Sequence, residues 1–180
     1  MCAIEYYTYD DYKQWEGDWE LIYGQPVAMA PSPIRNHQNV LAMLTYELNK
    51  TFKDCDDCEV LVEEDYIICD DTVLRPDISV VCNEDNDFIT KAPEIIVEIV
   101  SKSTAKRDEK IKFEIYEKEL VKYYILVYPD RLTAKIYKNE NSQFKKIGDF
   151  SKETVNLSEN LTCEAEIDFE NVFKKLRRKK

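Results

Sequence analysis

The sequence is poor in glycine, histidine and long apolar runs. Its 180 residues include 3 glycines and 1 histidine. So little glycine excludes collagen-like chains, glycine-rich linkers and the glycine-rich loops that cradle nucleotide phosphates. No apolar run approaches the ~18 residues that suggest a membrane span. The first six residues also lack the basic-then-apolar pattern of a secretory signal. We therefore expect a cytoplasmic protein that makes no contact with membranes.

Acidic residues dominate the charge. The chain has 36 Asp and Glu against 25 Lys and Arg, and its net charge is -11. Six of the cations lie in the last seven residues, so 19 cations remain against 36 anions elsewhere. Because DNA binding draws on cations that neutralise phosphates, this acidic body should repel nucleic acid. A phosphate substrate would need a local cationic site, a metal or the tail. We interpret the tail as a solvated helix end whose cations complement the helix dipole.

Length and composition predict one domain with its own core. Hydrophobic residues make up 44% of the chain, which excludes a disordered protein. We expect residues 1–173 to form this domain and residues 174–180 to form a basic tail.

Six cysteines are present: Cys2, Cys55, Cys58, Cys69, Cys82 and Cys163. Cys55 and Cys58 form a CxxC motif, but no second CxxC or histidine pair follows at zinc spacing. Without an export signal, disulfides are not expected. We favour buried apolar cysteines, notably Cys69 and Cys82 within strand-like runs, over structural zinc.

Hydrophobic periodicity predicts a mixed β-sheet flanked by helices, an α+β arrangement. Helices are expected at residues 8–16, 36–52, 104–119 and 168–176. Strands are expected at residues 21–23, 27–29, 59–69, 78–82, 95–100, 123–128, 134–137 and 144–147. A polar loop should cover residues 83–92.

Two acidic residues lie in or next to apolar strands, where burial of a carboxylate costs free energy. Glu98 lies inside the apolar strand at 95–100, and Asp77 directly precedes the strand at 78–82. A buried carboxylate must be paired, hydrogen-bonded or bound to a metal. If the two strands pair, their carboxylates could converge into a site of hard oxygen ligands for Mg²⁺. The alternative, which these residues favour equally, is a capped strand end and an edge-exposed glutamate.

The helix at 104–119 adds a buried cation to this picture. At about 100° per residue, Asp108 and Lys112 fall within the apolar arc of Ile111 and Ile115. As i,i+4 neighbours they could pair. They could form a structural ion pair, or Lys112 could orient a water and stabilise charge on a phosphate.

The ordered set of motifs resembles the Uma-two family of putative restriction endonucleases, within the PD-(D/E)XK nuclease superfamily. The resemblance extends from about Tyr7 to Tyr137. It includes His37 and the segments Glu20–Gly24, Met29–Pro33, Arg75–Asp77 and Glu98–Thr104, followed by Asp108, Lys112 and Tyr116.

This resemblance implies a single-domain, restriction-endonuclease-like fold and a metal-dependent phosphodiesterase. Asp77 and Glu98 would hold Mg²⁺, or Mn²⁺, with Glu20 as a further acid. The superfamily's lysine position is Val100 here, and Lys112 would replace it. Lys102 could compete with Lys112 for that role.

The remaining candidates have supporting roles. Asp108 would hold Lys112, and Tyr116 would cover the site or bind a phosphate. His37 lies on an apolar helix face, which favours a core or capping residue, while the resemblance favours a place near the site.

We expect DNA as the substrate and a homodimer, because paired cuts suit twofold symmetry. Two alternatives stay open: a catalytically silent binding or assembly domain, and a hydrolase of a smaller phosphate ester.

Overall fold

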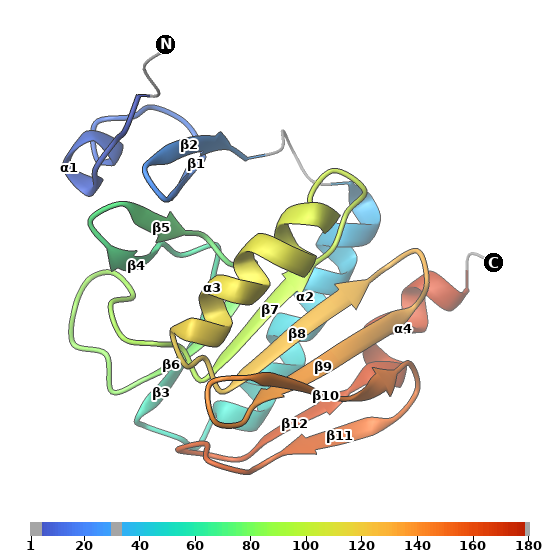
Figure 1. Cartoon of the computed structure of the whole chain (residues 1–180). Coiled ribbons are helices and arrows are strands. Elements are labelled where there is room, and N and C mark those ends of the chain that lie inside the picture. The colour runs from blue at the N-terminus through green and yellow to red at the C-terminus, as the bar shows by residue number, and fades with distance from the viewer. Residues whose placement is uncertain (1–4, 30–33, 179–180) are drawn as a thin grey trace.

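The computed structural model describes residues 5–29 and 34–178. Its centre is a six-stranded mixed sheet (Figure 1). The strands follow the order β10 (Phe144–Phe150), β9 (Thr133–Asn139), β8 (Tyr123–Tyr128), β7 (Ile95–Ile99), β6 (Ile78–Cys82) and β3 (Cys58–Val62). Only β7 and β8 pair in parallel within this described sheet, and the other neighbours are antiparallel.

Helices cover both faces of this sheet (Figure 1). α2 (Arg35–Phe52) and α4 (Phe169–Arg177) pack on one face, together with the hairpin of β11 (Thr154–Leu157) and β12 (Ala165–Asp168). The π-helix η1 (Arg107–Lys112) continues into α3 (Phe113–Lys118), whose apolar residues pack on the other face. A sheet covered on both sides needs apolar strands, and β7 and β8 are buried at every position.

Strand alternation decides which face each β7 side chain meets. Ile95, Val97 and Ile99 belong to the cluster around α2, whereas Ile96 belongs to the cluster around α3. Glu98 shares the parity of Ile96, so its side chain points toward the η1 and α3 side. This alternation places a carboxylate next to the helix that carries Lys112.

A second, four-stranded sheet lies beside the first (Figure 1). Its order is β2 (Gln25–Ala28), β1 (Trp19–Ile22), β5 (Thr72–Leu74) and β4 (Tyr66–Cys69). Tyr23 and Gly24 form the tight β1–β2 turn with positive φ angles. The short helix α1 (Tyr9–Tyr12) precedes this sheet, with Thr8 at its N-cap. β1 and β5 bring Glu20 and Arg75 into contact.

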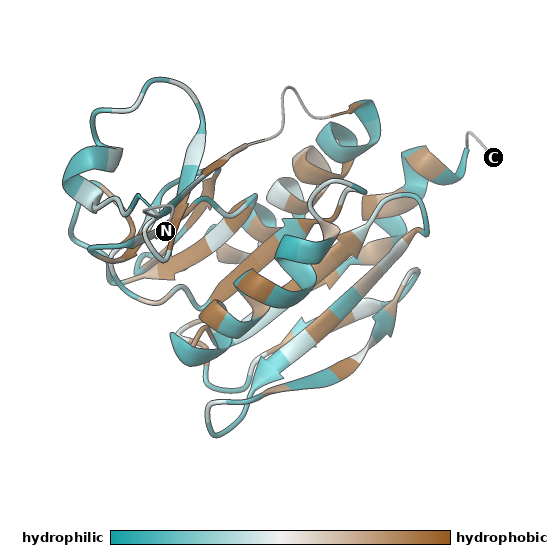
Figure 2. Ribbon diagram, turned by 45° about the horizontal axis from the view of Figure 1, so that its top comes forward, coloured by the Kyte–Doolittle hydropathy of each residue, from teal (hydrophilic) through white to brown (hydrophobic). Residues whose placement is uncertain are grey.

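The predicted α+β fold, a mixed sheet flanked by helices, is confirmed. The long helix begins and ends within one residue of prediction. Asp168 caps α4 and accepts a hydrogen bond from the Asn171 backbone N–H. Three short strands, β5, β11 and β12, were not predicted. α4 continues to Arg177 and buries Leu176, so it crosses the boundary that we expected between the domain, ending at residue 173, and the tail, beginning at residue 174. Brown, hydrophobic strands mark the core in Figure 2.

The prediction for the cysteines is wrong. Cys69 is exposed, because β4 lies at the edge of the second sheet and Cys69 ends that strand. Cys82 forms a disulfide with Cys58, and Cys55 forms one with Cys163. Cys2 lies outside the described residues, as do residues 30–33 of the Met29–Pro33 motif.

Within the part of the chain that the structure describes, no helix has both the length and the apolarity needed to cross a membrane.

Candidate active site

A pocket of about 520 Å³ opens where the two sheets, the start of α2 and η1 meet. Every candidate site residue named from the sequence except Tyr116 lines it: Glu20, His37, Asp77, Glu98, Lys102, Asp108 and Lys112. Residues separated by up to 92 positions therefore reach one cavity.

Lys112 connects two acids at the buried end of the site. Its Nζ lies 2.7 Å from Oε1 of Glu20 and 2.8 Å from Oε1 of Glu98. Only 3% of Lys112 is exposed to solvent. Burial alone would lower the pKa of Lys112, but the charges of Glu20 and Glu98 outweigh it and raise that pKa. Lys112 is therefore held as an ammonium ion.

Glu98 is held from two directions. Besides Lys112, the Tyr116 hydroxyl donates a hydrogen bond of 3.1 Å to Oε1 of Glu98. Burial raises the pKa of Glu98 well above its usual range, and Lys112 opposes that rise. Tyr116 itself is fully buried. We expected Tyr116 to cover the site or bind a phosphate; in the structure its hydroxyl contacts Glu98, and Tyr116 is not among the residues that line the pocket.

Asp77 joins the start of β6 to the end of β7. Its Oδ2 accepts a hydrogen bond of 2.6 Å from the Ile99 backbone N–H, next to Glu98. Its Oδ1 lies 3.4 Å from Nε2 of His37. Burial alone would lower the pKa of His37, but the hydrogen bond to Asp77 and its charge raise it. His37 is therefore a neighbour of the acidic site rather than a core residue.

Glu20 enters the site from the second sheet. Its Oε1 accepts the Arg75 backbone N–H at 3.0 Å as well as Lys112. Its Oε2 lies 3.3 Å from Nη1 of Arg107, yet it accepts no hydrogen bond although it is buried. Glu20 thus offers an oxygen with no hydrogen-bond donor.

Arg107 is a further site residue that the sequence did not predict. It is the first residue of η1, and its guanidinium lines the pocket beside Glu20. Nothing in the local pattern distinguishes Arg107 from the nearby Lys106 and Lys110. Its place depends on the approach of β1, which lies 85 or more residues earlier in the chain.

The predicted pairing of Asp108 with Lys112 is wrong: both residues are described, and they form no ion pair with each other. The helix is a π-helix over Arg107–Lys112, so the i,i+4 geometry of an α-helix does not apply there. Asp108 is buried, and burial raises its pKa while Lys112 and a hydrogen bond from Thr104 oppose that change. Lys102 lies exposed at the pocket rim. The structure thus brings Lys112, and not Lys102, to the carboxylates.

The oxygen donors fit Mg²⁺ in type, and Oε2 of Glu20, which accepts no hydrogen bond, adds a buried oxygen to the set. Among the described residues, the only groups of three compact His, Cys, Asp or Glu ligands contain cysteine and lie elsewhere. Glu20, Asp77 and Glu98 therefore do not form a closed three-carboxylate cage. Mg²⁺ usually takes one or two carboxylates and keeps several waters, which suits such an open set.

Fold and pocket together define an α+β protein of the restriction-endonuclease-like class. A solved structure described as a putative nuclease belonging to DUF820, from Anabaena variabilis ATCC 29413, has the same fold. The two share a TM-score of 0.73 and 19% identity, and the match covers 94% of this chain and 98% of that one.

The family follows from the sequence match. The Uma2 family model, described as putative restriction endonuclease, matches residues 9–170, and the chain belongs to this family. The resemblance drawn from the motifs is thereby confirmed. No curated protein matches the chain. The description of the family supports a nuclease function.

Proposed function

We propose that this protein is a Mg²⁺-dependent endonuclease that hydrolyses DNA phosphodiester bonds in the pocket between the two sheets. The observation that carries the proposal is the position of Lys112. Its ammonium lies between Glu20 and Glu98 in a site that also contains Asp77. Acids and one buried cation around a pocket suit a reaction in which negative charge develops on a phosphate.

Asp77 and Glu98 would hold the metal ion, with Glu20 assisting directly or through water. When bound, Mg²⁺ or Mn²⁺ lowers the pKa of a coordinated water and polarises the phosphate. The contacts of Asp77 with the Ile99 backbone, and of Glu98 with Tyr116, fix both carboxylates before substrate arrives.

Lys112 acts as a positioned charge rather than as a base. Its raised pKa keeps the proton on Nζ, so Nζ can donate a hydrogen bond but cannot accept a proton. We expect it to orient the attacking water and to stabilise the anionic transition state. Asp108 affects this charge only at longer range, since it forms no ion pair with Lys112.

The pocket rim supplies the local cations that an acidic protein needs to accept a phosphate. Lys102 is exposed there, and Arg107 extends from η1 into the same pocket. Both lie near the proposed metal ligands, in a chain whose net charge is -11. These two side chains would hold the phosphates that flank the scissile bond. We also propose a cytoplasmic homodimer, because twofold symmetry suits cleavage of both strands of a duplex.

A hydrolase of a smaller phosphate ester is the second candidate. The net charge of -11 favours it, because a small ester contacts little of the repulsive surface. A catalytically silent binding domain is the third possibility.

The test compares three substrates with Mg²⁺, with Mn²⁺ and with EDTA: supercoiled plasmid, single-stranded DNA and bis-p-nitrophenyl phosphate. We expect metal-dependent nicking of the plasmid. Faster turnover of the small ester than of either DNA would support the second candidate. Absence of all three activities from folded protein would identify a silent domain.

Lys112→Met should abolish any genuine activity, and Lys110→Met, an exposed site on the same helix, is its matched control.

A further inference from the structure

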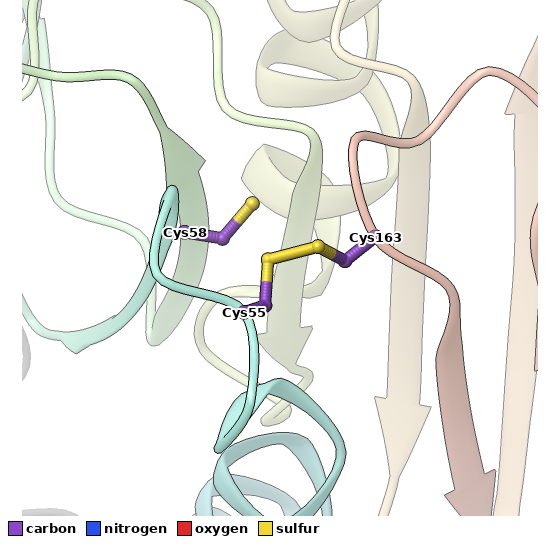
Figure 3. A group of neighbouring side chains, drawn as sticks. All are labelled: Cys55, Cys58 and Cys163. Atoms are coloured by element: carbon purple, nitrogen blue, oxygen red, sulfur yellow. A yellow bond between two sulfur atoms is a disulfide. The ribbon is translucent and has the colours of Figure 1, made fainter.

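Four cysteines lie near one another at the end of the main sheet, outside the pocket, and Figure 3 shows three of them, Cys55, Cys58 and Cys163. The Cys82 sulfur lies within 4.8 Å of the Cys58 sulfur but falls outside the compact group of those three. Cys55 and Cys58 come from the turn between α2 and β3. Cys82 ends β6, and Cys163 lies in the segment between β11 and β12. In the structure they form the disulfides Cys55–Cys163 and Cys58–Cys82.

The two disulfides are not independent of each other in space. The sulfurs of Cys55, Cys58 and Cys163 all lie within 4.8 Å of one another, although Cys58 is bonded to Cys82. Figure 3 shows the Cys58 sulfur beside the Cys55–Cys163 bond. Two disulfides need no such proximity. A tetrahedral zinc site requires it, because zinc–sulfur bonds of about 2.3 Å place the sulfurs about 3.8 Å apart.

Backbone pairing holds two of the cysteines next to each other independently of their disulfide. Cys58 and Cys82 lie directly opposite each other in the antiparallel β3–β6 pair, with their Cα atoms 4.0 Å apart. Disulfides usually have Cα atoms at least about 4.4 Å apart. The Asn83 backbone N–H donates to the Asp57 carbonyl at 2.7 Å and closes the turn that carries Cys58.

Cys163 is also held independently of its sulfur. The neighbouring Thr162 donates to Glu94 through both its backbone N–H, at 2.8 Å, and its hydroxyl, at 2.7 Å. Lys122 pairs with the same carboxylate. Glu94 also comes close to Cys58 and Cys82, but these bonds already engage both of its oxygens. Glu94 is therefore better placed to support the cysteine cluster than to act as a metal ligand.

We propose that Cys55, Cys58, Cys82 and Cys163, in the reduced chain, bind one Zn²⁺ as a structural tetrathiolate site. The CxxC turn supplies two ligands and two distant segments supply the others, which completes a closed Cys₄ set. Each thiol loses a proton to the solvent when it binds the ion, and no electrons are transferred.

The site is distinct from the proposed nuclease pocket. His37 lies in the first turn of α2 and Cys55 follows its end, and an 18-residue helix is about 27 Å long. With no open coordination position, the zinc would take no part in hydrolysis. It would attach the β11–β12 hairpin to the α2–β3 turn and to β6.

The test measures the zinc content of full-length protein purified with a reductant under nitrogen, together with the alkylation state of each cysteine by peptide mass spectrometry. We expect one zinc per chain. Cys163→Ser and Cys82→Ser should lose most of it, whereas Cys69→Ser, at a cysteine that is free and exposed, should keep it. Replacing zinc by Co²⁺ in the unmutated protein should give the absorption of a tetrahedral thiolate site, a readout that needs no variant to fold.

Two results would overturn the proposal. One is a zinc-free protein in which Cys55, Cys58, Cys82 and Cys163 remain linked as two disulfides despite the reductant used in purification, because that pattern defines two stable disulfides. The other is an unmutated protein that yields no thiolate–cobalt absorption although all four thiols are reduced. Neither result depends on nuclease activity, so this proposal and the proposed function can fail separately.

Discussion

The Lys112 ammonium lies 2.8 Å from the Glu98 carboxylate, and both side chains are almost completely shielded from solvent. This pair joins the end of η1 to the middle of β7, and Glu20 adds a contact from the second sheet. A buried ion pair gives little net stability, but loss of one partner is expensive because the other charge stays buried and unpaired. The cluster therefore makes strong predictions for single substitutions.

Lys112→Met should destabilise the fold as well as remove activity. Glu20 and Glu98 would face each other without a cation, and the expected loss is about 3–5 kcal/mol. Urea unfolding followed by fluorescence would measure it. Lys110→Met, on the solvent side of the same helix, should change the free energy of unfolding by less than about 0.5 kcal/mol. Equal effects of the two substitutions would contradict the buried cluster.

Asp77→Asn should separate metal binding from folding. The amide oxygen can still accept the Ile99 N–H, so stability should change little, while the negative charge at the proposed metal site is lost. We expect at least a 100-fold lower rate of plasmid nicking, the scale of removing one electrostatic group from an active site. Circular dichroism confirms folding, and Asp85→Asn, at an exposed position of the 83–92 loop, is the control. Asp77→Asn with full activity would refute the role of Asp77.

Tyr116→Phe removes only the hydroxyl that holds Glu98. The lost hydrogen bond should lower the free energy of unfolding by about 1–3 kcal/mol, because a buried carboxylate oxygen loses a donor. If Tyr116→Phe lowers the nicking rate less than Asp77→Asn does, Tyr116 acts by positioning Glu98. A loss as large as that of Asp77→Asn, with unchanged stability, would instead place Tyr116 at the substrate.

As the pH falls, the 83–92 loop should unfold before the core does. Burial by itself would raise the pKa of Glu84, but hydrogen bonds from the Thr90 and Lys91 backbones and from Asn86 outweigh it and lower that pKa to about 2. The unfolded value is 4.5, so this stabilisation is present above about pH 4.5 and is lost as the pH falls toward 2.

Glu84→Gln provides the comparison for this loop. The variant should be less stable than the parent at pH 6 and should approach the parent at pH 2, where Glu84 is half protonated. Hydrogen exchange of the Thr90 and Lys91 amides would follow the change. If the difference in stability between the two proteins stays constant with pH, the charge of the Glu84 carboxylate is excluded as its cause.

Much of the sheet was predictable, because β7 and β8 are continuous apolar runs and α2 has strong helical periodicity. β5, β11 and β12 are only three or four residues long, and long-range pairing rather than local pattern defines them. Asp77, Glu98 and Lys112 could be selected because charge in an apolar run is costly. Glu20 came from the family resemblance alone, and Arg107 depends on a contact between distant segments. The missing Asp108–Lys112 pair could not be predicted, because α-helical spacing does not hold in the π-helix.

The most direct test of the account is the initial rate of plasmid nicking at saturating Mg²⁺ by Glu98→Gln, compared with the parent and with Glu59→Gln, an exposed glutamate on β3. We predict metal-dependent nicking by the parent and by Glu59→Gln, and a rate at least 100-fold lower for folded Glu98→Gln. Equal nicking by Glu98→Gln and the parent would contradict the central claim that Glu98 is part of a nuclease site.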